Sequence, residues 1–194
     1  MSTPAADTGP TAEAISAFVM AAHGDSEKVR SLLEADPRLL EERTALDETA
    51  LAAAAHTGQR AIAEYLLAQG ARTDLCAAAM LGEVDVVRAA LAEDPTQARI
   101  GGAHGISILF HAALSGRREL CELLLGYGAD AREGDGQQPV LHGAVYADAP
   151  GVAALLVAAG ADPAARDFGG RTAEELARAM GRTAVAEIVR AGGR

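Results

Sequence analysis

The chain has few aromatic residues and few cysteines. Among its 194 residues there is no tryptophan, and there are only three phenylalanines, three tyrosines and two cysteines. So few aromatic rings argue against a core built on them, and the abundant alanine and glycine favour helices that approach one another closely. Cys76 and Cys121 lie on different expected helices without metal-ligand spacing, so we expect two buried, reduced thiols and no disulfide framework.

Positive charge and long apolar runs are also scarce. Seventeen Lys and Arg face 27 Asp and Glu, a net charge of −10. This balance argues against nucleic-acid binding, because phosphate contacts need clustered cations. No apolar run approaches membrane-spanning length, and no basic segment followed by an apolar run opens the chain as a signal peptide would. We therefore expect a cytoplasmic protein without a membrane partner, its acidic side chains forming a solvated outer face.

A repeated pattern fills most of the chain. Six segments end in a glycine slot, which Asp148 takes in the fifth: ISAFVMAAHG (15–24), TALAAAAHTG (49–58), TDLCAAAMLG (73–82), SILFHAALSG (107–116), PVLHGAVYAD (139–148) and TAEELARAMG (172–181). Apolar residues recur four to five and eight to nine residues after each slot, which marks one buried face of a second helix. The pattern predicts six helix-turn-helix units.

The order of residues resembles the ankyrin repeat, whose core reads T-P-L-H-x-A-A-x-x-G and, further on, L-L-L-x-x-G-A. Segment 105–129 fits it most fully, through Ser107, Leu109, Ala112, Ala113, Gly116, Leu124, Leu125, Gly128 and Ala129. The resemblance covers about residues 15–193. It implies an all-α ankyrin-repeat solenoid of about six helix-turn-helix repeats with short β-hairpin fingers. We expect a disordered leader at 1–10 and an ankyrin-repeat domain at 11–194.

The spacing of the glycine slots is uneven. The second step, from Gly58 to Gly82, is markedly shorter than the other four, which stay close to the family period of about 33 residues. Fingers fit in 38–48, 96–106, 130–138 and 162–171, but no room is left for one between repeats two and three.

A single constant shift along the chain, without gaps, places Gly24 on Gly82 and Gly58 on Gly116. This indicates that repeats one and two are duplicated as three and four. The same shift places Asp36-Pro37 on Asp94-Pro95, where proline should stop the preceding helix. In the last repeat Glu174 and Glu175 replace apolar residues, as a water-facing end of the stack requires.

The resemblance implies partner binding through the concave face and the finger tips. The concave candidates are His23, His56, Met80, Leu81, His111, Leu114, Tyr146 and Met180. The finger-tip candidates are Arg43, Leu46, Asp47, His104, Ile106, Phe168 and Arg171. We expect His23 and His56 to face solvent, and the apolar members to form a binding stripe unless neighbouring fingers cover them. This predicts a monomeric protein-binding or scaffold module that needs no cofactor.

A second hypothesis remains open. The missing finger would leave an apolar notch near Met80, Leu81 and Leu114, as in a small-molecule-binding protein or an atypical enzyme. His56, His111 or Tyr146 would then serve as polar anchors or acid–base groups, but the sequence identifies no catalytic residue.

The remaining histidine patterns favour structural roles. His142 occupies the family's histidine slot, which implies a hydrogen bond to a neighbouring repeat, and His111 lies one place after that slot. No metal site is predicted, because His23 and His56 would need close approach and a third ligand that the sequence does not specify.

Overall fold

The computed structural model describes residues 9–134 and 136–193. They form two compact units, one up to Arg72 and one from Thr73 to the C-terminal end, called here the N-terminal and C-terminal units. Most of the predicted leader, residues 1–8, lies outside the described residues. The first helix begins at Ala12, and the Thr11 hydroxyl caps it by accepting a hydrogen bond from the backbone N–H of Ala14 at 3.2 Å.

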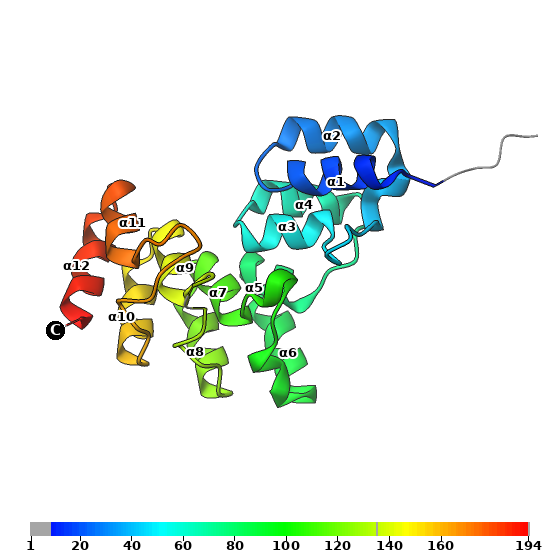
Figure 1. The fold of residues 1–194 in the computed structure, drawn as a ribbon. Helices are drawn as coiled ribbons and strands as arrows, with labels where there is room; N and C mark the ends of the chain where they lie inside the picture. Colours follow the sequence, from blue (N-terminus) through cyan, green and yellow to red (C-terminus); the bar gives the residue numbers. More distant parts are fainter. Residues whose placement is uncertain (1–8, 135, 194) are drawn as a thin grey trace, which may run out of the picture. The chain divides into compact units, whose positions relative to one another are not determined.

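The N-terminal unit contains two helix pairs, α1 (Ala12–Ala21) with α2 (Ser26–Ala35) and α3 (Ala50–His56) with α4 (Arg60–Ala68) (Figure 1). The 3-10 helix η1 (Pro37–Glu41) follows α2. Helix α1 packs against α2 and α3, and α3 packs against α4. Phe18, Val29, Leu39 and Leu66 are fully buried and belong to its core.

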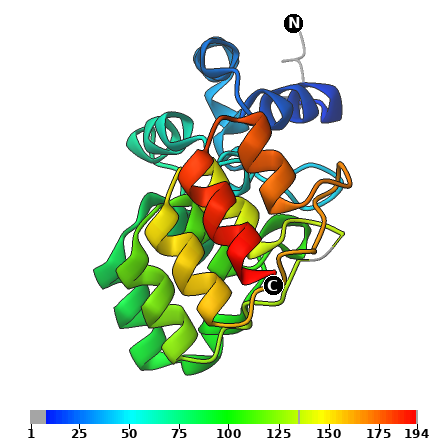
Figure 2. The ribbon, with the colours of Figure 1, turned by 90° about the vertical axis from the view of Figure 1, so that its left-hand side faces the viewer.

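The C-terminal unit contains four helix pairs. Its elements are α5 (Leu75–Leu81), α6 (Val84–Glu93), η2 (Pro95–Arg99), η3 (Ala103–Gly105), α7 (Ile108–Leu114), α8 (Arg118–Gly126), α9 (Val140–Tyr146), α10 (Pro150–Ala158), α11 (Ala173–Ala179) and α12 (Thr183–Gly192). The first helices α5, α7, α9 and α11 pack in a row, and α6, α8, α10 and α12 form a second row. Figure 2 shows α10 and α12 side by side. The helical repeat architecture expected from the sequence is confirmed.

Small residues set the distance between neighbouring first helices. A Cβ added to Gly143 of α9 would lie 2.9 Å from both the Cβ of Ala113 and the carbonyl oxygen of Phe110 in α7. Such contacts are too short for any side chain, so α9 packs this closely on α7 only because residue 143 is glycine.

Glycine occupies most of the slots because the backbone there adopts a left-handed conformation. Gly116 has φ of 70°, and Asp148, the only non-glycine residue in the six slots, has φ of 50°. Aspartate is one of the few residues that tolerate this left-handed conformation. Its carboxylate also pairs with Arg182 in the next repeat at 3.0 Å.

Internal symmetry is visible in the element bounds. The shift that carries Gly24 onto Gly82 also carries both ends of α2, η1, α3 and α4 onto those of α6, η2, α7 and α8, respectively. Asp36 and Asp94 each follow a helix that stops one residue earlier, and each caps the 3-10 helix that begins at the next residue, a proline. The Asp-Pro stop predicted from the sequence is therefore confirmed, with the added finding that a second helical turn starts there.

The fingers are less regular than the predicted β-hairpins. Isolated antiparallel bridges join Gly101 to Ser107 and Arg166 to Thr172, and the described residues form no sheet. The expected fingers at 38–48 and 96–106 begin inside η1 and η2, since the proline at each start favours a helical turn. Between α4 and α5 only residues 69–74 connect the helices, in agreement with the missing finger. No helix in the described ranges has the length and apolar character to traverse a lipid bilayer.

Candidate functional site

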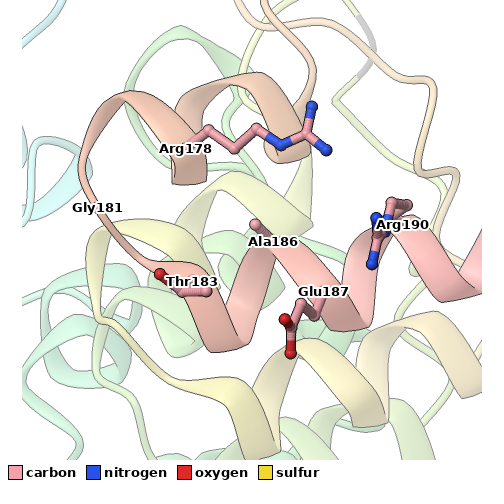
Figure 3. A pocket seen from close by; sticks show the side chains of 6 residues that line it. All are labelled: Arg178, Gly181, Thr183, Ala186, Glu187 and Arg190. Carbon is pink, nitrogen blue, oxygen red and sulfur yellow. The ribbon is translucent and has the colours of Figure 1, made fainter.

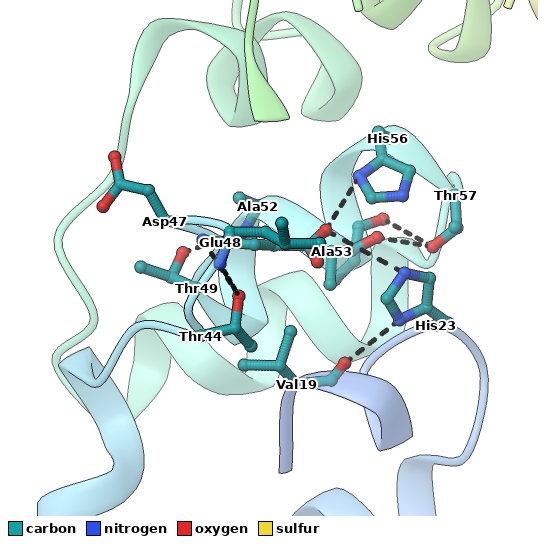
Figure 4. A network of polar contacts seen from close by, with 12 residues as sticks. Val19, His23, Thr44, Asp47, Glu48, Thr49, Ala52, Ala53, His56 and Thr57 are labelled. Atoms are coloured by element: carbon teal, nitrogen blue, oxygen red, sulfur yellow. Dashed lines mark hydrogen bonds and ion pairs between the residues drawn. The ribbon is translucent and has the colours of Figure 1, made fainter. Parts of the chain in front are cut away.

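Three polar side chains meet inside the N-terminal unit: His23, Glu48 and His56 (Figure 4). The Nδ1 atom of His56 lies 3.4 Å, and the Nε2 atom of His23 lies 3.9 Å, from Oε1 of Glu48. The two imidazole rings stand edge to face with centroids 5.2 Å apart. We call these three residues the His–Glu cluster.

A tight turn directs Glu48 inward. The backbone N–H of Thr44 donates to the carbonyl of Glu48 at 3.0 Å, and the backbone N–H of Glu48 donates to the Thr44 hydroxyl at 3.3 Å. Asp47, with φ of 60°, reverses the chain between them. Thr49 then caps α3, so the carboxylate of Glu48 is fixed just before the helix, with only 7% of its side chain exposed.

The two histidines stand at helix C-terminal ends. His56 is the last residue of α3 and His23 follows the C-cap of α1. The expectation that His56 faces solvent is wrong: its side chain is 7% exposed, because Glu48 and His23 pack against it. His23 is 29% exposed. The sequence named both histidines as concave candidates, but it missed Glu48, which the finger turn adds.

The predicted apolar stripe is only partly at the surface. Met80 and Leu81 are buried, at 2% and 7%, whereas Tyr146 and Met180 are 37% and 39% exposed. Helix α5 contains seven apolar residues and therefore has no polar face to turn toward water. The exposed part of the predicted stripe thus lies on the later repeats, with Leu114 half-buried.

Two further histidines of the C-terminal unit are structural. His142 is fully buried, and its Nε2–H donates to the carbonyl of Arg171 in the next repeat at 2.9 Å, as the family slot implied. His111 is buried rather than open to a groove, and its Nδ1–H donates to the carbonyl of Ser107 at 2.8 Å. Burial lowers the pKa of both imidazoles below the usual value.

The finger-tip candidates divide by exposure. Leu46 is 76% and Phe168 is 65% exposed, as a tip requires. Ile106 is 3% exposed, so its placement at a tip is wrong: it adjoins the bridge residue Ser107 at the base of the finger. His104 is exposed in the same finger.

Two candidate arginines hold fingers rather than extend from them. Arg43 donates to the carbonyl and carboxylate of Asp47, both at 3.1 Å. Arg171 pairs with Asp167 at 2.9 Å. Each contact joins two residues of the same finger. The Arg43 contact therefore stiffens the loop that presents Leu46, and the Arg171 contact stiffens the loop that presents Phe168.

A surface depression of about 250 Å³ lies between α11 and α12 (Figure 3). Charged Arg178, Glu187 and Arg190 surround it, together with Gly181, Thr183 and Ala186. None of these residues was a candidate site residue in the sequence analysis, and the polar lining fits a solvated end of a helix stack.

The fold agrees with comparisons with known proteins. The family model of ankyrin repeats (3 copies) matches residues 17–98 and 75–167. This covers more than half of the sequence, and the chain belongs to the ankyrin repeat family. A crystal structure of an ankyrin repeat domain from Acinetobacter baumannii AYE is similar, with a TM-score of 0.52 and 23% identity over 91% of this chain and 97% of that chain. That likeness concerns the fold alone. No curated protein matches the sequence.

Proposed function

We propose that this chain is a protein-binding module whose C-terminal unit contacts the partner through Phe168, Tyr146 and Met180. Ankyrin repeats generally serve as protein–protein interaction modules, and the fold itself specifies no partner. The observation that carries the proposal is Phe168, a large aromatic side chain held 65% exposed on a well-fixed finger.

Hydrogen bonds fix the finger around Phe168. The Asp167 carboxylate accepts from the backbone N–H of Arg171 at 2.8 Å and from its guanidinium at 2.9 Å. Burial raises the pKa of Asp167, but the hydrogen bonds and charge of Arg171 outweigh that effect and leave the pKa lowered. The carboxylate therefore stays ionised and paired. The backbone N–H of Phe168 donates to the carbonyl of Gln137 in the preceding finger at 3.0 Å.

This stiffness matters for binding. A side chain that is already held in place loses little conformational entropy when a partner covers it. Tyr146 adds a second aromatic side chain, 37% exposed, one turn along α9 from His142, whose ring donates to the Arg171 carbonyl of this finger. Aromatic side chains are frequent among the residues that dominate binding energy at interfaces.

The test uses a photo-reactive phenylalanine analogue at position 168, followed by affinity measurements on the partner it captures. Phe168→Ala and Tyr146→Ala should each weaken binding by about 2 kcal/mol, roughly 30-fold, as central interface residues do. Tyr127→Ala is the matched control, because Tyr127 is also 37% exposed but follows α8, a second-row helix.

The proposal fails if Phe168→Ala and Tyr146→Ala bind as tightly as the native chain, or if Tyr127→Ala weakens binding equally. Circular dichroism of each variant distinguishes loss of contact from loss of fold. A monomeric state and a cytoplasmic location remain predictions from the sequence.

The small-molecule alternative gains no support from these residues. That hypothesis placed a ligand pocket near Met80, Leu81 and Leu114. Five surface depressions are found on the described part of the chain, and none of the five is lined by any of these three residues.

A further inference from the structure

The His–Glu cluster has the chemistry of a metal site rather than of a partner surface. One atom from each of His23, Glu48 and His56 lies within 4.8 Å of the other two. Glu48 and His56 are almost completely buried, so they cannot form an open contact surface. Two imidazoles with one carboxylate match the donor set of three-ligand zinc sites.

The distances suit a small divalent ion. Zinc bonds of about 2.0–2.1 Å in a tetrahedron separate the ligand atoms by roughly 3.4 Å. His56 Nδ1 already lies 3.4 Å from Glu48 Oε1, and His23 Nε2 lies 3.9 Å from it. The three ligand atoms lie within 4.8 Å of one another, so the partly exposed His23 ring would move its Nε2 atom toward the other two when the ion binds.

The hydrogen bonding of His23 selects the nitrogen that can bind. Its Nδ1 lies 3.1 Å from the carbonyl oxygen of Val19, which can only accept, so Nδ1 carries the hydrogen. In the neutral ring Nε2 then holds the available lone pair, and Nε2 is the atom that faces Glu48. A backbone carbonyl on the second nitrogen is the usual support of a metal-bound histidine.

The surroundings also favour positive charge. Both histidines lie at the C-terminal ends of helices, where backbone carbonyls give a partial negative charge that stabilises cations. Glu48 adds a full negative charge when ionised. His23 is 29% exposed, which leaves solvent access for a water molecule as the fourth ligand.

The internal duplicate shows that the fold does not need these polar groups. The shift that carries Gly24 onto Gly82 makes Leu81, Ile106 and Leu114 the equivalents of His23, Glu48 and His56, respectively. Leu81 and Ile106 are buried and Leu114 is half-buried, so the same three positions of an equivalent helix pair are apolar. The polar set is therefore particular to the N-terminal unit and is not a requirement of the repeat.

We propose that His23 Nε2, the Glu48 carboxylate and His56 Nδ1 bind one divalent transition-metal ion of the zinc class. Imidazole ligands select such ions over magnesium and calcium, which prefer oxygen. When the ion binds, His56 gives its Nδ1 lone pair and keeps its hydrogen on Nε2. The ion links α1, the turn at residues 44–48 and α3, and so stabilises the N-terminal unit.

The experiment uses the full chain without a histidine tag, stripped with a chelator and dialysed. Calorimetric titration with Zn²⁺ should give one site per chain, and Co²⁺ should give the visible absorption of a four-coordinate centre with nitrogen and oxygen ligands. Zn²⁺ should raise the thermal midpoint, because a ligand that binds only the folded state stabilises it. Binding should weaken on acidification, since protons compete for the ligand atoms.

The decisive variant copies the duplicate: His23→Leu, Glu48→Ile and His56→Leu together. It should keep the helical circular dichroism and a cooperative melt, and lose both the Zn²⁺ site and the Co²⁺ spectrum. The control His104→Asn removes an exposed histidine of the C-terminal unit, in an asparagine-tolerant conformation with φ of 57°, and should bind as the native chain does.

A second variant keeps the proposal testable if the triple variant does not fold. His23→Gln changes only the most exposed ligand and should weaken Zn²⁺ binding by more than the roughly 10–100-fold that loss of an outer-shell partner costs. The proposal is overturned if the native chain binds no Zn²⁺ stoichiometrically, if the folded triple variant retains the site, or if His23→Gln binds like His104→Asn.

Discussion

Gly143→Ala should destabilise the C-terminal unit, although alanine is the better helix former. Gly143 lies inside α9, where α9 packs on α7. The added methyl carbon would lie 2.9 Å from the Phe110 carbonyl oxygen and 2.9 Å from the Ala113 methyl group. Neither atom can rotate away, because one belongs to the backbone and the other is a Cβ, so the two helices must separate.

Whether Gly143→Ala lowers or raises the free energy of unfolding depends on two opposing contributions. Replacing glycine by alanine in a helix gains about 1 kcal/mol. Forcing an extra carbon into a packed core costs about 1–3 kcal/mol, and two stiff contacts place this site at the upper end. The expected net loss of unfolding free energy is therefore about 1–2 kcal/mol. For a chain of this size each kcal/mol corresponds to roughly 2–4 °C in thermal midpoint.

Gly151→Ala is the matched control. Gly151 lies in the neighbouring helix α10 and has no atom within 4 Å of an added Cβ. It should gain up to about 1 kcal/mol. Urea unfolding of both variants, followed by circular dichroism, measures the difference. A Gly143→Ala variant as stable as the native chain, or stabilised like Gly151→Ala, would refute the close-packing argument.

Two further predictions concern buried titratable groups. Since the folded-state pKa of His111 and His142 is lowered, the unfolded chain binds more protons below its own pKa of about 6.5, and stability should fall as the pH drops below that value. Each histidine changes the free energy of unfolding by at most about 1.4 kcal/mol per pH unit. His142→Gln should reduce the pH dependence of the urea-unfolding free energy below about pH 6.5, and an unchanged pH dependence would contradict this assignment. Burial raises the pKa of Cys76 and Cys121 to about 12. Neither thiol should therefore react with a disulfide reagent at about pH 8 until the chain is unfolded, and rapid reaction of the native chain would show that the thiols are open.

Much of the fold was readable from local patterns. The left-handed conformation at Gly116 and Asp148 depends on a single residue and its neighbours, so the slots marked the turns correctly. Asp36-Pro37 and Asp94-Pro95 stopped their helices for a similarly local reason. The shift that carries Gly24 onto Gly82 indicated a duplication, and the bounds of four pairs of elements match under it.

The candidate sites were predicted less well, because exposure depends on what packs above a residue. Glu48 gave one overlooked signal: its equivalent in the duplicated half is Ile106, an apolar residue, which could have indicated burial. The resemblance to the ankyrin repeat placed His56 and Met80 in surface slots without showing what would cover them.

The sequence by itself determined the repeat class, the helix order and the short connection before α5. These follow from backbone conformation and hydrophobic periodicity, which act over a few residues. Only the tertiary structure decided that His23, Glu48 and His56 converge, and that Ile106 and Leu81 are buried. That convergence depends on how a finger turn packs against two helix ends that belong to different repeats, and no local pattern in the chain encodes the contact.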